Sequence, residues 1–286
     1  MAASAATFFC KNHPFPKVGR FISRKCLPSV MFRFLVLIVL LSYACGNPRL
    51  KTSDTENPLN ETAASARLLF FSKTAAFRHE SIPSGLAALQ RIAQQSNWQW
   101  VATERSTIFH PDSLPRFDAI VLLNTTGDVF DDAQQEALRR YVRAGGALVG
   151  IHAATDTEHD WPWYQKAMAA KFDSHPAPQE ARLIVRRDQD HPATRHLPAE
   201  WRVYDEWYYF AAPVGDYVTP LLFLDRESIT GGKSSTGQHP LCWYHEYDGG
   251  RVFYTALGHT EAIYQNPAYL QHLQGAIDWA LAPQNH

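Results

Sequence analysis

The segment GALVGIHAATDTEHDWPWY, Gly146 to Tyr164, passes from an apolar half into a half rich in titratable and aromatic side chains. The apolar half, which ends near Ile151, is a short run of the kind found in buried parallel strands. The second half carries two histidines, two aspartates, a glutamate and two tryptophans. A purely structural loop would prefer small turn residues. This loop therefore predicts a sugar pocket or a proton-transfer site at the end of a buried strand.

The sequence on both sides of this segment alternates apolar strands with amphipathic helices. In the first half we predict strands over 67–72, 98–104, 117–124 and 147–153, and helices over 81–97 and 131–146. The second half is richer in β structure, with strands predicted over 180–187, 219–225, 239–247 and 250–259 and a closing helix over 266–282. This pattern predicts an α/β fold with a mainly parallel sheet and helices on both faces. Because neither an internal repeat nor a second linker is evident, we expect one domain over 66–284.

Three predicted strands are followed by polar side chains that could take part in chemistry. His79 follows the first strand, Asn124 the third and His152 the fourth. In open α/β sheets, ligands bind beyond the carboxyl ends of the strands. We therefore expect these three side chains to lie on the edge of the sheet that forms the site.

The first 45 residues differ from the rest of the chain in composition. They hold six basic and no acidic residues, followed by the apolar run FLVLIVLL. That run is short for a membrane span and ends at LSYAC, a small-residue cleavage site, so we predict a signal peptide over 1–45 with its start at Met31. The site resembles a bacterial lipoprotein box, which predicts a lipid anchor on Cys45 and a periplasmic or cell-surface protein. An ordinary signal peptide or an anchor helix is the alternative.

The composition beyond the signal limits the partners of the protein. Residues 46–65 have few large apolar side chains and predict a flexible tether. Without residues 1–45 the chain keeps 21 basic and 28 acidic side chains, a formal net charge of −7. This charge makes nucleic acid an unexpected partner. Only Cys45 and Cys242 remain of four cysteines, which excludes an internal disulfide framework.

Four ordered motifs carry a resemblance to a known family. They are KTAAFRHESI (73–82), GGALVGIHAATDT (145–157), YDEWYYF (204–210) and GQHPLCWYHEYDGGRVFYTALGH (237–259). Together they resemble the ThuA-like (trehalose-utilisation) family of the class I glutamine amidotransferase-like superfamily, over about residues 67–283. The resemblance implies a flavodoxin-like domain.

One residue departs from the superfamily's catalytic pattern. In the amidotransferases a cysteine nucleophile lies on a sharp turn after a strand, and His152 of GIHAA stands at the corresponding position. The segment GHTE, 258–261, resembles the one that carries the histidine and glutamate of the triad. A glutaminase needs its thiol, and Cys242 lies in the middle of a predicted strand as a small core residue. We therefore expect no glutamine hydrolysis.

The resemblance implies carbohydrate chemistry, namely the cleavage of glycosides oxidised at C3. Such a ketone acidifies the C2 proton, so that a base removes it, an acid protonates the departing oxygen and water adds later. We expect His152, His259 and a protonated Glu206 to share these roles, in an order that the sequence leaves open, with Asp156 as a further candidate. Substrate contacts are expected from Arg78, His79, Trp161, Trp163, Trp207 and His239.

Each candidate also has a purely structural interpretation. His152 and His259 could be hydrogen-bonded core histidines, Glu206 could form an ion pair, and Asp156 could cap the following turn. The six substrate-binding candidates could anchor the first loop, lie at a strand edge or pack a loop onto the domain. We place three other histidines at the surface or in loops: His159, His175 and His191.

Thirteen histidines also raise the question of a metal. Because neither an H-x-x-x-H helix nor paired cysteines occur, a divalent metal would need ligands from distant loops, such as His79, His152, Glu206 and His259. The ion would act as a Lewis acid on keto and hydroxyl oxygens. Nothing else in the sequence indicates a cofactor.

Two classes of function therefore remain open. The first is a surface-attached enzyme that acts on 3-keto glycosides made by a sugar oxidoreductase, and the second is a carbohydrate-binding lipoprotein without turnover. Ionisable side chains at strand ends favour the enzyme. An assembly module in a sugar-processing complex is a weaker third alternative.

Overall fold

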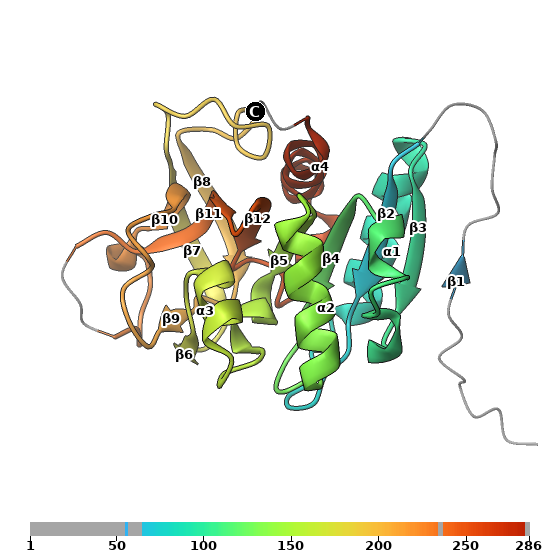
Figure 1. Ribbon diagram of the computed structural model, residues 1–286. Coiled ribbons are helices and arrows are strands. Elements are labelled where there is room, and N and C mark those ends of the chain that lie inside the picture. The colour runs from blue at the N-terminus through green and yellow to red at the C-terminus, as the bar shows by residue number, and fades with distance from the viewer. Residues whose placement is uncertain (1–54, 57–64, 234–236, 284–286) are drawn as a thin grey trace, which may run out of the picture. The chain divides into compact units, whose positions relative to one another are not determined.

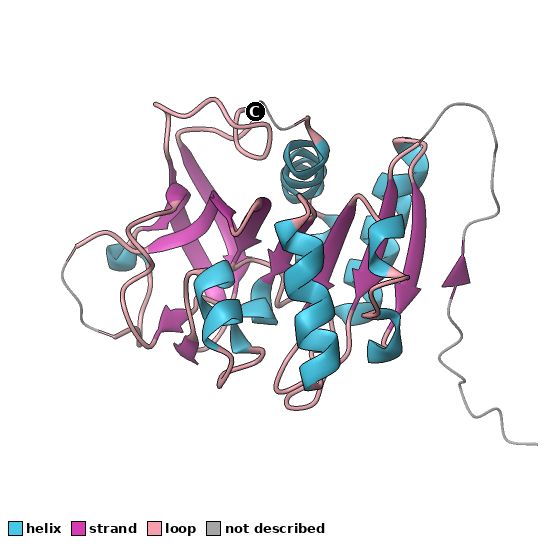
Figure 2. Ribbon diagram, in the orientation of Figure 1, coloured by secondary structure: helices cyan, strands magenta, loops and turns pink. Residues whose placement is uncertain are grey.

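A ten-stranded mixed sheet organises the computed structural model, which describes residues 55–56, 65–233 and 237–283 (Figures 1 and 2). The strand order is β1-β3-β2-β4-β5-β12-β11-β10-β7-β8. Its strands are β1 (Thr55–Glu56), β2 (Arg67–Phe71), β3 (Gln99–Thr103), β4 (Ala119–Leu123), β5 (Ala147–Ile151), β7 (Gln179–Val185), β8 (Glu200–Asp205), β10 (Thr219–Leu224), β11 (Pro240–Tyr247) and β12 (Gly250–Thr255). The strands β6 (Phe172–Ser174) and β9 (Tyr209–Phe210) form a separate pair.

Parallel pairing holds the half of the sheet formed by β3, β2, β4, β5 and β12. Every residue of β4 and β5 is buried, as their continuous apolar sequences predict for strands covered on both faces. The expected α/β fold is confirmed, and each strand predicted for the first half lies within two residues of its expected bounds. The remaining strands, from β12 through β8, pair in antiparallel fashion.

Helices cover both faces of the sheet. They are α1 (Ile82–Gln95), α2 (Asp132–Arg143), α3 (Pro162–Met168) and α4 (Pro267–Leu281), with short 3-10 turns η1 (Ser106–Ile108), η2 (Leu114–Arg116), η3 (His152–Asp156), η4 (Arg226–Ser228) and η5 (Ala262–Gln265). α1 and α4 pack together, whereas α2 and α3 lie on the other face, in front in Figure 1. Asp131 and Gln134 form a capping box that begins α2, as predicted, and Gly145 with φ 96° follows its end.

Besides β1 and the short 3-10 turns, four of the described elements were not predicted from the sequence: α3, β6, β8 and β9. The strand β8 matters most, because its buried and exposed residues alternate and its last residue, Asp205, precedes Glu206. This strand forms the edge of the sheet, paired only with β7. It brings the motif YDEWYYF to the sheet that carries the other motifs.

The predictions for the N-terminal region concern residues that the structure leaves mostly undescribed. The signal peptide, its start at Met31 and the anchor on Cys45 lie outside the described residues. Within the predicted tether, Thr55 and Glu56 pair with β3, so those two residues form strand rather than unpaired linker. No helix among the described residues has the length and apolar character that a membrane crossing requires.

Candidate functional site

Four side chains from distant parts of the chain meet at the carboxyl edge of the parallel strands. They are His79 after β2, His152 after β5, Glu206 after β8 and His259 after β12, and their candidate ligand atoms all lie within 4.8 Å of one another. We call these four residues the strand-end cluster. Three of them are buried, and His259 is partly exposed. The sequence proposed this combination for a metal, and the fold brings it together.

His152 occupies a turn with a special backbone conformation. Its φ is 50°, in the left-handed region, at the step from β5 into η3. A strained strand-to-helix turn of this kind presents the nucleophile in hydrolases and amidotransferase-like folds. Its Nδ1 lies 2.7 Å from the carbonyl oxygen of Ala256, and the backbone carbonyl of His152 accepts a hydrogen bond from the Tyr254 hydroxyl. The ring is thereby fixed with Nε2 directed toward the cluster.

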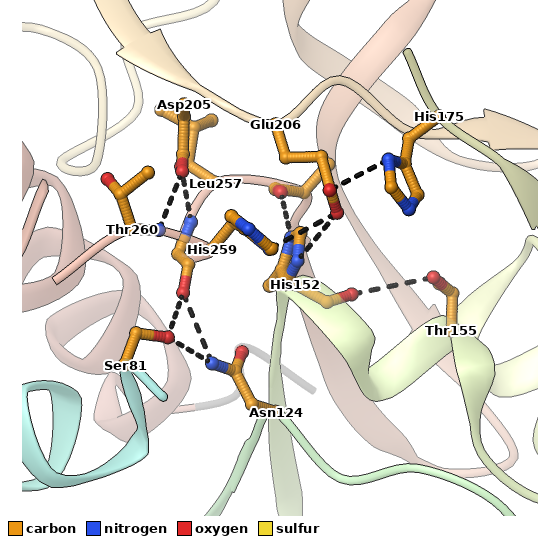
Figure 3. Close-up of polar contacts among 12 residues, drawn as sticks. Ser81, Asn124, His152, Thr155, His175, Asp205, Glu206, Leu257, His259 and Thr260 are labelled. Carbon is orange, nitrogen blue, oxygen red and sulfur yellow. Dashed lines mark hydrogen bonds and ion pairs between the residues drawn. The ribbon is translucent and has the colours of Figure 1, made fainter. Parts of the chain in front are cut away.

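A buried hydrogen-bond network holds three strand-end loops against each other (Figure 3). The Ser81 hydroxyl donates to the carbonyl oxygen of Gly258, and the Asn124 amide donates both to that oxygen and to the Ser81 oxygen. Gly258 has φ 130°, which disfavours any side chain at this position. The network fixes the loop of His79 relative to the loop of His259. Asn124 thus supports the site through its amide nitrogen, while its Oδ1 has no hydrogen-bond partner among the described residues.

Asp205 fixes the His259 turn from the opposite side. Its two carboxylate oxygens accept hydrogen bonds from the backbone N–H groups of Gly258, at 2.7 Å, and Thr260, at 2.9 Å (Figure 3). Burial raises the pKa of Asp205, while the nearby His152 opposes this rise. Sequence reasoning passed over Asp205, although it adjoins Glu206 in the same motif.

Glu206 is surrounded by imidazoles. Its carboxylate lies 3.5 Å from His152 Nε2, 3.2 Å from His259 Nδ1 and 2.7 Å from His175 Nδ1. Burial alone would raise the pKa of Glu206, but His152 and His259 lower it to about 2. The expectation of a protonated Glu206 is therefore wrong, because sequence neighbours indicated aromatic surroundings and the fold supplied imidazoles.

The other two imidazoles of the strand-end cluster respond differently to their surroundings. Burial, followed by repulsion from His152, lowers the pKa of His79 to about 3. For His259, burial acts to lower the pKa, yet the Glu206 carboxylate outweighs it and raises the pKa. The cluster thus holds an ionised carboxylate together with a neutral imidazole and a more basic one.

Two residues near the cluster were missed by sequence reasoning. His175, which we placed in a surface loop, has a side chain 41% exposed and points its Nδ1 at Glu206 Oε1. Phe77 is 64% exposed, and its ring centroid lies 4.9 Å from that of His79. An exposed ring beside a polar pocket suits the apolar face of a sugar. Of these two residues, only Phe77 could have been found from the sequence, because it lies two positions before His79 in the first motif.

Asp156 lies on the turn η3 next to the cluster but outside it. Its Oδ1 is 2.9 Å from His159 Nε2. Burial raises the pKa of Asp156, and His159 works against that shift. The pair places a second partly exposed imidazole near the site.

The predicted tryptophan platforms are packed into the protein. Trp207 is fully buried and donates its indole N–H to Gln179, so the expectation of a sugar contact is wrong for this residue. Trp161 is buried and stacks on Trp163, whose indole donates to Asp248. Trp161 and Trp163 therefore pack a loop onto the domain, because the start of α3 turns Trp161 toward α2 and Trp163 toward the β11–β12 turn.

The last two predicted substrate contacts also have structural partners. Arg78 forms an ion pair with Glu104 at 2.6 Å, which anchors the first loop to the end of β3. His239 is buried and its Nε2 lies 2.8 Å from the carbonyl oxygen of Tyr208. It lines a groove of about 790 Å³ that none of the strand-end cluster lines. Neither side chain reaches the cluster.

The structure also explains two residues whose environments the sequence left open. Cys242 is a buried free thiol in β11, as predicted for a core residue, and burial raises its pKa. It cannot serve as a nucleophile there. His191, expected at the surface or in a loop, lies in the loop between β7 and β8, where it is buried with its ring stacked on Phe253.

Comparison with known proteins agrees with this geometry. Two solved ThuA-like proteins share the fold. The protein from Bacteroides uniformis is 22% identical, and the match covers 80% of this chain and 97% of that chain at a TM-score of 0.67. The protein from Parabacteroides merdae is 21% identical, and the match covers 77% of this chain and 91% of that chain at a TM-score of 0.63. A cytoplasmic protein from Salmonella typhimurium is 14% identical, with 75% and 99% covered at 0.57. These likenesses support the flavodoxin-like, glutamine amidotransferase-like fold.

Sequence comparison gives the family. No curated protein matches the chain. The sequence model of one family, described as trehalose utilisation, matches residues 67–280, which include every member of the strand-end cluster. The chain therefore belongs to the ThuA, or trehalose-utilisation, family.

Proposed function

We propose that this protein cleaves glycosides that carry a ketone at C3, by removal of the C2 proton followed by elimination and hydration. The observation that carries the proposal is the pairing of the partly exposed His175 with the ionised, buried Glu206 at the strand ends. A family linked to trehalose utilisation makes a sugar substrate a natural choice. A site built only for binding has no need of such a proton-transfer pair.

The elimination balances without an oxidant. A base takes the proton from C2, the electron pair forms the C1–C2 double bond, and the C1–oxygen bond breaks. The departing oxygen takes up a proton and leaves as an alcohol or sugar. Water then adds across the double bond and returns a 3-keto sugar.

His175 is our candidate for the base. Its Nδ1 lies 2.7 Å from Glu206 Oε1 and 2.9 Å from the carbonyl oxygen of Pro176, so Nδ1 carries the proton and Nε2 keeps a lone pair. The Glu206 carboxylate accepts this hydrogen bond and so holds the ring in one orientation, as the carboxylate does in a catalytic triad. In this proposal the ionised Glu206 is the partner of the base His175. That role replaces the earlier expectation of a protonated Glu206 that acts as the acid.

The ketone must come from a separate reaction. A sugar oxidoreductase that oxidises a secondary hydroxyl at C3 would supply the substrate, and nothing in this chain performs that step in our proposal. Export with a lipid anchor on Cys45 would place the enzyme where glycosides are taken up. A carbohydrate-binding lipoprotein without turnover is the alternative, because burial of charged groups can also serve recognition.

The test is incubation of the purified protein with matched plain and 3-keto glycosides in D₂O. We expect cleavage of the 3-keto forms, much slower reaction of the plain forms, and deuterium at C2 of the product. His175→Gln should lower kcat by about 10²-fold or more with its fold intact, the loss typical of a missing general base. Binding without any turnover would favour the alternative. Equal cleavage of both forms without exchange at C2 would indicate ordinary glycoside hydrolysis instead.

A further inference from the structure

One ring nitrogen of each histidine in the strand-end cluster lacks a hydrogen-bond partner. Among the described residues, His79 Nδ1, His152 Nε2 and His259 Nδ1 are all buried and unpartnered. The contacts of His152 and His259 with Glu206 are close, at 3.5 and 3.2 Å, but do not meet hydrogen-bond geometry. Buried polar atoms are rarely left unsatisfied, so three at one point call for a common partner.

The rings around this point are arranged edge to face. His79 meets His152 at 87° and His259 at 88°, with ring centroids 4.8 and 5.3 Å apart. The rings therefore do not stack on one another, and one nitrogen of each lies within 4.8 Å of the other ligand atoms. Donors around a zinc-sized ion lie about 3–4 Å apart, so the observed limit of 4.8 Å requires only small side-chain rotations.

The surroundings orient these side chains as metal ligands are oriented. A ligating histidine usually donates its second ring N–H to a carbonyl or carboxylate, and His152 does so to Ala256 at 2.7 Å. Glu206 has one oxygen toward His152 and His259, while the other lies 2.7 Å from His175. The network of Ser81, Asn124 and Asp205 fixes the loops that carry His79 and His259.

We propose that the strand-end cluster binds one divalent transition-metal ion through three imidazole nitrogens and one carboxylate oxygen. Imidazole-rich sites favour Zn²⁺, Co²⁺, Ni²⁺ or Fe²⁺ over Mg²⁺ and Ca²⁺, which take oxygen ligands. The partly exposed His259 lies on the open side, where a substrate oxygen could join the coordination sphere. There the ion would stabilise the enolate. This catalytic role rests on the proposed function, whereas the binding of the ion is independent of it.

Metal content of the whole protein tests this inference without any substrate. The protein is stripped with dipicolinate and titrated separately with ZnCl₂, CoCl₂ and MgCl₂, followed by calorimetry, elemental analysis and the visible absorption of Co²⁺. We expect about one Zn²⁺ or Co²⁺ per chain and a Co²⁺ spectrum of imidazole ligation. His79→Gln and His259→Gln should each weaken binding by about 10²-fold or more, since loss of an outer partner alone typically costs 10–100-fold.

One variant serves as the matched control. His239→Gln alters another buried histidine outside the cluster and should keep one ion per chain with unchanged affinity. His175→Gln removes an outer partner of Glu206 and should keep one ion per chain, with affinity lowered by no more than about 10–100-fold. Absence of Zn²⁺ and Co²⁺ binding in the folded protein, equal binding in all variants, or binding of Mg²⁺ alone would overturn the inference. A protein that holds the ion yet leaves 3-keto glycosides intact would refute the proposed function and leave the metal site standing.

Discussion

At the scale of single residues, the site depends on side chains that act through others. Asp205 acts through the backbone, because its two carboxylate oxygens accept hydrogen bonds from the N–H groups on either side of His259. A buried carboxylate in this position satisfies two N–H groups that would otherwise be unpaired. The position of His259 in the site therefore depends on Asp205, a residue of another strand.

Replacing Asp205 tests this dependence. Asp205→Asn presents an amide N–H₂ to one of the two backbone donors, so one buried N–H loses its acceptor. We expect the free energy of unfolding to fall by about 1–3 kcal/mol. Urea denaturation measures it, with the exposed Asp112→Asn as the control. Unchanged stability in Asp205→Asn would show that neither hydrogen bond matters.

At the scale of elements, α4 is joined to the sheet by a buried histidine. His272 lies 2.8 Å from the carbonyl oxygen of Ala193 through Nδ1 and 3.2 Å from the Thr255 hydroxyl through Nε2. Burial lowers the pKa of His272 to about 4, although the hydrogen bond to Ala193 acts in the other direction. The helix is thus held by a neutral imidazole.

This neutral imidazole predicts a loss of stability in acid. Between pH 6.5 and about 4 the unfolded chain binds a proton at His272 that the folded protein does not, so stability falls as the pH falls, by up to about 1.4 kcal/mol per unit for this group. Above pH 6.5 both states are neutral and the dependence vanishes. His272→Gln should reduce the slope of unfolding free energy against pH by about one proton. His110→Gln, on an exposed side chain, should keep the slope; equal slopes in both variants would contradict the prediction.

At the scale of the whole molecule, the parallel and antiparallel halves of the sheet contribute different parts of the site. His79 and His152 come from loops of the parallel half, while Glu206 follows β8 at the far antiparallel edge. The carboxyl end of β8 itself lies at the site, because its last residue, Asp205, bonds the backbone around His259 and the next residue, Glu206, lies 3.5 Å from His152. No single segment carries the chemistry, so the domain must fold as a whole for the site to exist.

The N-terminal region predicts where this domain resides in the cell. If Cys45 carries a lipid anchor, Cys45→Ala should move the protein from the membrane fraction to the soluble fraction or block its maturation, because a diacylated thiol supplies the membrane affinity. Fractionation followed by immunoblotting measures this, with Ser53→Ala in the predicted tether as the control. Membrane association that persists in Cys45→Ala would speak for an ordinary anchor helix.

Local sequence determined the α/β framework, because apolar runs and helical spacing act within a few residues. The strands β2, β4 and β5 and the helix α2 with its Asp131 cap follow directly from those patterns. The family motifs also pointed to His152 and His259. Because His152 follows a predicted strand and His259 ends one, their positions in the sequence were enough to predict the edge of the sheet on which they meet.

Tertiary structure alone decided the environment of each site residue. Glu206 is ionised because loops remote in sequence bring imidazoles to it, and His175 becomes a site residue through a contact 31 positions away along the chain. Of the tryptophans that the sequence offered as sugar platforms, Trp161 and Trp207 are buried, and Trp163 is half-buried with its indole bonded to Asp248. Charge state and exposure depend on neighbours in space, and those neighbours are fixed only when the sheet is complete.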